Sequence, residues 1–349
     1  MALDERSTGP VEASADPAAR PEGTPVPARR GPRSLPPWAR ITLLAVLAAG
    51  FAAAYLTYDV TGNVAYVIER RSTVVLTMVV VAFAGAVSTV LFHTVTDNRI
   101  LTPSIMGMEA LFTLVQTSLV FVFGIAGLNM FPPAVEFLAQ TALMLLFAVL
   151  LFQRLFTGGI GSLHLTLLVG IVFGVLFGSL SQLMRRLLTP DEFTALQSRL
   201  FARLTRADPE LLPWVAAAVV LVAVYVWRMH RVMDVVALGR ESAVNLGVDH
   251  RRVALQTLMI VALLTAASTA LVGPMTFFGF MAATLAYQLA GSHEHRHVMP
   301  VAFLIGMCAL VGGQFFLEHL LGHAGTLSVV IEFTGGALFL YFLLRKAAR

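Results

Sequence analysis

Three histidines alternate within one short polar stretch, and imidazole is a common metal ligand. The stretch reads GSHEHRHVMP and contains His293, His295 and His297. Alternating positions in a short loop favour a solvated turn, so we expect no metal site there. An intramembrane metalloenzyme would need a zinc-binding cluster of the HExxH type, and we identify none in this sequence. We likewise expect no cofactor.

Four carboxylates lie in or beside long apolar runs, where an acidic side chain is a functional candidate by default. Glu109 falls in an expected first helical turn, where the helix dipole favours a negative charge. Only Glu332 is deep, and one carboxylate makes a poor proton relay. An ion-coupled secondary transporter would need several paired charges, so it is the less favoured class. The four are Glu109, Glu136, Glu318 and Glu332.

The composition is that of an integral membrane protein. Of 349 residues, 57% are hydrophobic and 13% are charged, whereas soluble domains carry about 25% charged residues. Long uncharged runs favour helices over a barrel. The single cysteine, Cys308, excludes an intrachain disulfide, and the single lysine, Lys346, lies in RKAAR. A P-loop needs a lysine after its glycines, so the chain is not a P-loop ATPase. The net charge of +4 gives no indication of nucleic-acid binding.

Apolar runs of about 20 residues, the length that crosses a bilayer, predict an all-α polytopic protein with ten spans. Residues 1–38 are rich in Pro, Ala, Gly, Glu and Arg, and such a segment cannot bury enough surface to fold. We expect a disordered cytoplasmic tail there and a membrane domain over 39–349, with both termini inside the cell. Val253 to Ser292 has no formal charge and must hold two spans, broken near Gly273 to Gly279. The other eight spans are expected near 41–59, 72–95, 104–123, 134–152, 163–184, 211–227, 299–317 and 327–344.

Five arginines lie on the predicted outer side, where the positive-inside rule does not expect them. Two begin the second span, and three share a face of an amphipathic helix expected from Thr189 to Arg206, with Thr189 as its cap and Pro190 in its first position. Two explanations remain open. The arginines bind lipid headgroups, or they dock the carboxylates of a partner protein, with which arginine pairs bidentately. The five are Arg70, Arg71, Arg199, Arg203 and Arg206.

Residues 237–248, ALGRESAVNLGV, predict a short helix exposed beneath the membrane. Gly239 and Gly247 bracket it, and glycine supplies the positive-φ turns that start and stop a helix abruptly. Arginines on both flanks indicate the cytoplasmic side. From the residues alone, an ordinary loop and a stub that docks on a partner both remain open.

This stretch resembles the coupling loop of the FecCD family, the permease subunits of ABC importers for iron–siderophores, haem and cobalamin. NRILTPSIMG, from Asn98 to Gly107, resembles the turn after the second span in the branch with anguibactin-type and petrobactin-type permeases. Two later family motifs are resembled by GPMTFFGFMAA and by the run from Gly335 to Leu344. The first lacks the Pro-His pair that usually follows it in the family, and the second lacks the family's proline. The coupling-loop positions that match are Leu238, Gly239, Glu241, Ala243, Leu246 and Gly247.

The resemblance implies a type II ABC importer permease fold in the bacterial cytoplasmic membrane, with no catalytic site of its own. It implies ABC ATPases on the coupling loop, a cytoplasmic gate at Asn98 and Ile100, and a binding lipoprotein or periplasmic protein docked outside. A second permease is implied, with a heterodimer favoured and a homodimer possible. His93 stands where the family usually has glutamine, so we expect no ligand role for it. The implied substrate is a ferric siderophore, and haem or cobalamin is the alternative.

Overall fold

The structure, a computed structural model, describes residues 35–60, 62–129, 131–157, 163–201, 204–319 and 326–347. These residues form helices joined by turns, with no strand among them. The tail expected at 1–38 lies almost entirely outside the described residues. The helices are α1 (Pro37–Thr57), α2 (Val64–Thr96), η1 (Pro103–Met106), α3 (Met108–Phe123), η2 (Gly124–Asn129), α4 (Pro133–Thr157), α5 (Leu163–Arg185), α6 (Pro190–Leu200), η3 (Leu204–Arg206), α7 (Leu212–Val236), α8 (Arg240–Asn245), α9 (His250–Val272), α10 (Phe278–Leu289), α11 (His295–Met307), η4 (Cys308–Gly312), α12 (Gly313–His319) and α13 (Leu327–Ala347).

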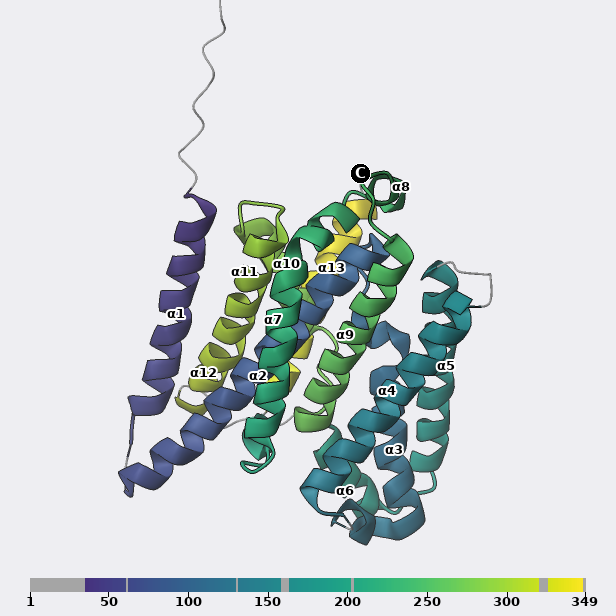
Figure 1. The fold of residues 1–349 in the computed structure, drawn as a ribbon. Helices are drawn as coiled ribbons and strands as arrows, with labels where there is room; N and C mark the ends of the chain where they lie inside the picture. The colour runs from purple at the N-terminus through teal and green to yellow at the C-terminus, as the bar shows by residue number, and fades with distance from the viewer. Residues whose placement is uncertain are drawn as a thin grey trace, which may run out of the picture. The chain divides into compact units, whose positions relative to one another are not determined.

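Nine helical segments in the described part of the chain are long and apolar enough to cross a membrane. Figure 1 shows them as one bundle, with α8 at one end and α6 at the other. One of the nine is built from α11, η4 and α12, which run on from residue 295 to 319. The all-α membrane fold expected from the sequence is therefore confirmed.

α10 is the exception to the ten expected spans. The expected break is confirmed, since α9 ends at Val272 and α10 begins at Phe278. With 12 residues, α10 is about 18 Å long and cannot cross a hydrocarbon core of about 30 Å. Its first turn lies against the middle of α2, where a Cβ on Gly279 would stand 2.6 Å from the carbonyl oxygen of Gly85. The predicted eighth span is therefore a half-length helix that begins inside the bundle.

α2 is longer than expected and runs diagonally through the bundle (Figure 1). It has 33 residues, a length of about 50 Å. The second span was expected to begin near residue 72, which was wrong because Asn63 caps a helix that starts at Val64. The Asn63 side-chain oxygen accepts a hydrogen bond from the backbone N–H of Tyr66 at 3.3 Å. From Val74 onward most α2 side chains are buried, so this helix is the axis of the fold.

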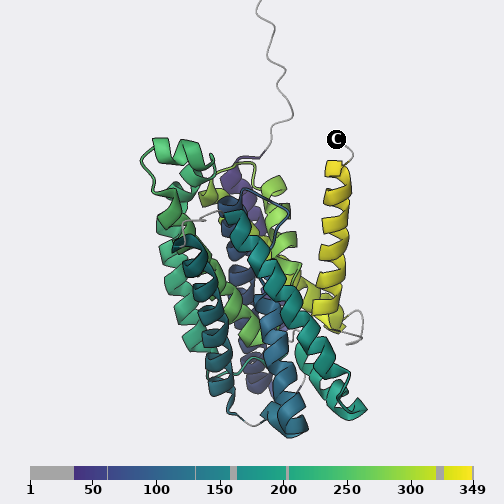
Figure 2. The same cartoon turned by 90° about the vertical axis from the view of Figure 1, so that its right-hand side faces the viewer.

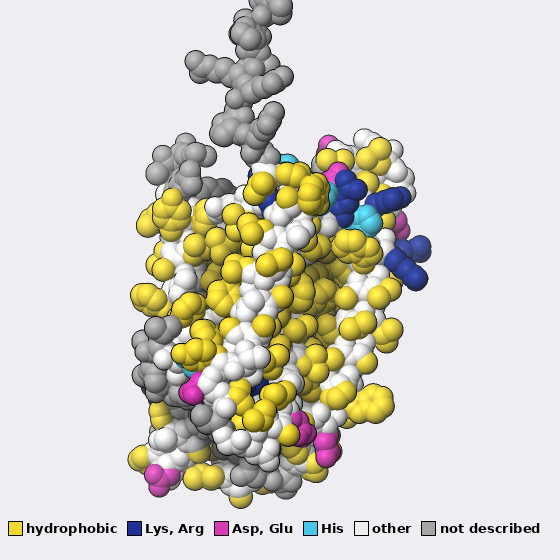
Figure 3. Space-filling model, turned by 90° about the vertical axis from the view of Figure 1, so that its left-hand side faces the viewer, with side chains coloured by type: hydrophobic (Ala, Val, Ile, Leu, Met, Phe, Trp, Pro, Cys, Tyr) yellow, Lys and Arg dark blue, Asp and Glu magenta, His cyan; other side chains and the backbone are white. Residues whose placement is uncertain are grey.

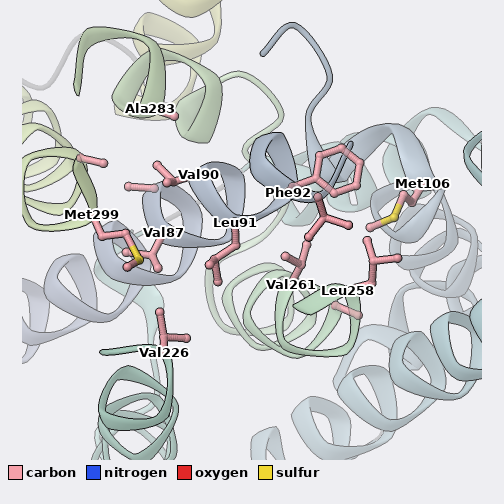
Figure 4. Close-up of a cluster of buried hydrophobic side chains, with 14 of the residues drawn as sticks. Val87, Val90, Leu91, Phe92, Met106, Val226, Leu258, Val261, Ala283 and Met299 are labelled. Atoms are coloured by element: carbon pink, nitrogen blue, oxygen red, sulfur yellow. The ribbon is translucent and has the colours of Figure 1, made fainter. Parts of the chain in front are cut away.

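The largest core cluster surrounds the second half of α2 (Figure 4). Close packing matters here because lipid gives helices little hydrophobic reason to associate. The labelled side chains come from α2, α7, α9, α10, α11 and η1. They are Val87, Val90, Leu91, Phe92, Met106, Val226, Leu258, Val261, Ala283 and Met299.

Glycines hold the start of α3 against α5. Gly107 has φ +83°, and a Cβ there would stand 3.0 Å from the carbonyl oxygen of Gly170 and the nitrogen of Gly174. Small residues allow such close backbone contact between membrane helices. Gly170 and Gly174 thus let α5 approach the backbone before α3 closely, whereas the described residues leave open space around Gly178.

α6 begins as predicted and ends early. Thr189 and Glu192 form a capping box, with the Thr189 hydroxyl accepting from the Glu192 backbone N–H and the Glu192 carboxylate accepting from the Thr189 backbone N–H. The helix stops at Leu200, and residue 206 belongs to the separate turn η3. The predicted continuous helix to residue 206 is therefore wrong, and so is the helical face shared by its three arginines. Arg203 lies outside the described residues.

The surface agrees with a membrane setting. On the face in Figure 3, hydrophobic side chains cover most of the area between the ends, and Lys and Arg side chains gather mainly at the end that carries α8. Figure 2 shows α13 at one edge of the bundle. α13 exposes the apolar side chains of Phe333, Leu340 and Leu344.

Candidate functional site

The turn after α2 is built by its own residues. Asp97 ends the helix with φ 48°, a left-handed conformation that Asp tolerates better than most side chains. The backbone N–H of Asn98 donates to the carbonyl of His93 at 3.3 Å. The Asn98 side-chain oxygen then accepts from the backbone N–H of Ile100 at 3.0 Å, which is an Asx turn. The two predicted gate residues thus belong to one hydrogen-bonded turn.

A cavity of about 590 Å³ lies beside this turn, a volume typical of small-molecule sites. The guanidinium of Arg99 lies 4.5 Å from the centre of the Tyr287 ring, within the range of a cation–π contact. The Tyr287 hydroxyl is 3.3 Å from Nδ1 of the buried His93. These contacts join the turn to α10. The lining also includes Thr94, Asn98, Ile100, Phe280 and His295.

α8 forms between two glycines, as the sequence predicted. Gly239 has φ +93° and Gly247 has φ +83°, and side chains other than glycine are strained there. Leu238 and Leu246 are each 62% exposed, and Val244 is 55% exposed. Ala243 is 0% exposed, so it packs against the bundle and is not part of the surface that a partner could cover. The predicted group of six coupling residues therefore includes one that lies beneath the surface.

Glu109 connects η1 to the segment before α10. Its carboxylate accepts from the Ser104 hydroxyl of η1 at 2.7 Å. It also accepts from the Thr276 hydroxyl, in the segment before α10, at 2.7 Å. Glu332 of α13 accepts from the backbone N–H of Phe277 at 3.3 Å. Glu332 thus satisfies a backbone group that the break before α10 leaves unpaired, whereas Glu109 pairs with side-chain hydroxyls.

The solvated turn that the sequence predicted covers only the first part of the histidine stretch. His293 and Glu294 are exposed before α11, whereas His295 is the first residue of α11 and is 4% exposed. The letters from His293 to His297 do match HExxH, which our sequence reasoning had not credited. That motif needs both histidines one turn apart on a single helix, and His293 precedes α11. Within the described residues no group of three His, Cys, Asp or Glu side chains could hold a metal ion.

Arg199 is engaged within the chain. Its Nη1 lies 2.7 Å from one carboxylate oxygen of Glu136 and 2.9 Å from the other. Gln116 and Gln140 donate to the same carboxylate at 2.8 and 3.0 Å. This cluster ties α6 to α3 and α4, so the charge of Arg199 is largely compensated before any partner arrives.

The neighbouring arginines Arg71 and Arg70 differ in how far the chain itself engages their charges. Arg71 donates from Nη1 to the backbone carbonyls of Tyr55 and Tyr58 at 2.9 and 2.6 Å. These carbonyls lie at the end of α1, where a cation is favoured. Arg70 is exposed and lines a hollow of about 340 Å³ with Glu69 and Leu204. Of this pair, Arg70 is the one whose charge lies open to a partner.

Comparison with known proteins decides the family. The model of the FecCD transport family matches residues 39–345. The chain belongs to the FecCD transport family. It is therefore a transmembrane permease subunit of the ABC importer type.

Two relatives of this FecCD chain cover most of its length. The petrobactin import system permease protein YclO of Bacillus subtilis is 42% identical over 308 residues, which is 88% of this chain and 97% of YclO. The petrobactin import system permease protein FatC of Bacillus anthracis is 40% identical over 282 residues, 81% of this chain and 80% of FatC. A solved inward-facing metal-chelate type ABC transporter shares the fold, with a TM-score of 0.74 and 18% identity over 88% of this chain and 99% of its own.

Three residues of the FecCD bundle escaped the sequence reasoning. Asp234, His295 and Thr94 join α7, α11 and α2 through hydrogen bonds of 2.7 Å. The only signal for His295 was the histidine stretch, which we interpreted as solvated. Asp234 lies in the segment before the predicted coupling loop, whose arginines served only to assign the cytoplasmic side. Nothing in the sequence singled out Thr94.

Proposed function

We propose that this chain carries a ferric siderophore through a bacterial cytoplasmic membrane as the permease of an ABC importer, by alternating access. One observation carries the substrate class: YclO, named for petrobactin import, matches 88% of the chain at 42% identity. Ferric petrobactin is therefore the first substrate to test. The chain performs no chemistry on its cargo, and ATP is hydrolysed by separate subunits.

α8 is the proposed contact with the ATPase. It presents Leu238, Val244 and Leu246 to solvent at one end of the bundle, and an apolar patch rimmed by charge is typical of a protein contact. Glu241 is exposed beside them. Gly239 and Gly247 provide the backbone angles at the two ends of α8, and the buried Ala243 packs α8 against the bundle. The contact is supported by the resemblance to the family's coupling loop.

The turn at Asn98 and Ile100 is the proposed inner gate. It lies next to the cavity of about 590 Å³ and is held to α10 by the contact between Arg99 and Tyr287. A gate must change conformation, and a short turn held by few contacts can do so at low cost. The cavity is the proposed path by which the chelate leaves.

The end that carries α8 is the proposed cytoplasmic side, with both termini there. Arginines gather at this end, as the positive-inside rule requires, including Arg228, Arg231, Arg251 and Arg252. The opposite end then faces a substrate-binding lipoprotein or periplasmic protein. Arg70 is the proposed docking residue for it. Arg71 and Arg199 support that surface through their internal contacts, and lipid headgroups are the alternative partners of Arg206.

A second permease subunit completes the pore. The exposed apolar side chains of α13 favour either lipid or another helix as neighbour. We favour a heterodimer, because the branch that NRILTPSIMG resembles commonly pairs two different permeases. Purification with one tagged and one untagged copy of this chain decides between the two arrangements.

The test is uptake by the assembled importer in proteoliposomes. The complex of this chain, its ATPase, its second permease and its binding protein should accumulate ferric petrobactin with ATP and not with a non-hydrolysable analogue. Haem and cobalamin serve as competing cargoes. Uptake driven by a sodium or proton gradient without ATP would overturn the proposal, and preference for haem or cobalamin would overturn the substrate class.

A further inference from the structure

His295 connects three helices through a single buried side chain. Its Nδ1 lies 2.7 Å from the Asp234 carboxylate on α7, and its Nε2 lies 2.7 Å from the Thr94 hydroxyl on α2. Its backbone N–H donates to the same Asp234 oxygen at 2.7 Å. Asp234 therefore also caps the first turn of α11 from a neighbouring helix.

The chemistry of these groups fixes the orientation of the ring. A carboxylate can only accept hydrogen bonds, so Nδ1 of His295 must carry a hydrogen. In the neutral ring Nε2 is then an acceptor, and the Thr94 hydroxyl donates to it at 2.7 Å. The Val90 carbonyl, 3.0 Å from the same hydroxyl, is the competing acceptor for that hydrogen. The ring is thus held from both sides and cannot rotate without breaking a bond.

The two partners of His295 lie at the ends of the helices that carry the proposed functional elements. Asp234 is two residues from the end of α7, and α8 follows at Arg240. Thr94 is two residues from the end of α2, and the turn at Asn98 follows. His295 therefore lies between the base of the proposed ATPase contact and the base of the proposed gate.

We propose that His295, held by Asp234 and Thr94, is a positioning residue that transmits a displacement of α8 to the turn at Asn98. The inference rests on the proposed function, because an ATPase must move α8. Apolar contacts between helices are non-directional and tolerate sliding. Hydrogen bonds weaken steeply with distance and angle. A shift of the end of α7 must therefore either drag α11 and α2 along or break these bonds.

Thr94→Val tests the link in the assembled importer with the least change in shape. It removes the hydroxyl and keeps a branched side chain of similar volume. A lost hydrogen bond changes an equilibrium by about fivefold, so siderophore transported per ATP hydrolysed should fall about fivefold. Thr94→Ser keeps the hydroxyl and should restore the ratio. Thr77→Val is the control for the loss of a threonine hydroxyl from α2, since Thr77 is buried in the same helix and donates to the Thr73 carbonyl, at 2.8 Å.

A labelling experiment reports on the gate without transport. With Cys308→Ala as background, Asn98→Cys should change its reactivity between nucleotide-free and ATP-trapped complexes. Thr94→Val should remove that change, whereas Thr77→Val should preserve it. If Thr94→Val assembles poorly, Asp234→Asn, which keeps an acceptor oxygen, is compared with Asp234→Leu, which has none. Only the leucine variant should lower transport per ATP.

The outcomes separate this inference from the proposed function. If the wild-type complex shows no ATP-driven uptake, both are overturned. If the wild-type complex transports, and Thr94→Val lowers transport and ATP hydrolysis in equal proportion, then Thr94, His295 and Asp234 only stabilise the fold. In that case the inference alone is overturned. Equal behaviour of Asp234→Asn and Asp234→Leu would overturn it as well.

Discussion

Substitution by aspartate should have different effects at two adjacent residues of α8. Val244→Asp places a carboxylate on the surface proposed to contact the ATPase, because Val244 is 55% exposed. Ala243→Asp places it against the bundle, because Ala243 is fully buried. The first variant should insert and unfold like wild type but lose its ATPase. The second should destabilise α8 itself.

The magnitude for Val244→Asp follows from what the contact would bury. Complete burial of a valine side chain contributes about 1.5–3 kcal/mol, and roughly half of that surface remains to be buried by a partner. A carboxylate desolvated without a counter-charge adds a further cost, so the total loss is about 2–4 kcal/mol per subunit. That corresponds to an affinity for the ATPase about 30-fold to 1,000-fold weaker.

The assay is recovery of the ATPase with a tagged permease, combined with uptake by proteoliposomes. Val244→Ala is the intermediate control, since it removes apolar area without adding charge. The thermal midpoint of the purified permease separates the two aspartate variants. Full ATPase recovery and full uptake with Val244→Asp would refute the assignment of this face.

Four further variants test the remaining proposals. Asn98→Cys, in a Cys308→Ala background, should react faster with a membrane-impermeant thiol reagent in one nucleotide state than in the other, and equal rates in both would remove Asn98 from the gate. Arg70→Glu should weaken binding-protein affinity several-fold, more so at low salt, while basal ATP hydrolysis is kept; Arg71→Glu should instead lower the thermal midpoint through the end of α1. Gly107→Ala should cost about 2–4 kcal/mol from its left-handed backbone and its close contact with α5, measured as a lower thermal midpoint; an unchanged midpoint would contradict the packing argument.

Hydropathy predicted where helices lie better than how long they are. The uncharged run from Val253 to Ser292 shows that two segments are present, and Gly273 with Pro274 marks the break. Hydropathy within that run does not distinguish a full span from a half-length helix, because the protein interior and the lipid are equally apolar surroundings for a helix. The start of α2 was missed for the opposite reason. Three consecutive charges from Glu69 to Arg71 interrupt the apolar pattern near its start, and the capping role of Asn63 is visible only in context.

Contacts between distant charges were outside the reach of sequence reasoning. The sequence predicted that Arg199 faces a partner or lipid, because it lies on the predicted outer side and shares a predicted helix face with Arg203 and Arg206. Its counter-charge, Glu136, lies 63 residues away in the chain. Glu136 is brought close because α6 and α4 both pack against α3. Helical spacing predicts neighbours within one helix only. The sequence reasoning assumed that all five arginines are exposed. Among those whose side chains the structure describes, Arg70 is the best candidate for docking, because it remains exposed.

The coupling-loop motif shows why a family pattern cannot assign roles by itself. All of its positions match equally well as letters, yet three physical demands act on them. Gly239 and Gly247 are needed for backbone angles that other residues resist. Ala243 is small because α8 must lie close to the bundle. Leu238 and Leu246 are apolar although they face solvent, which fits the proposed contact with the ATPase. On that proposal the motif combines a requirement of the fold with a requirement of the partner, and substitutions on the two sides of α8 separate them.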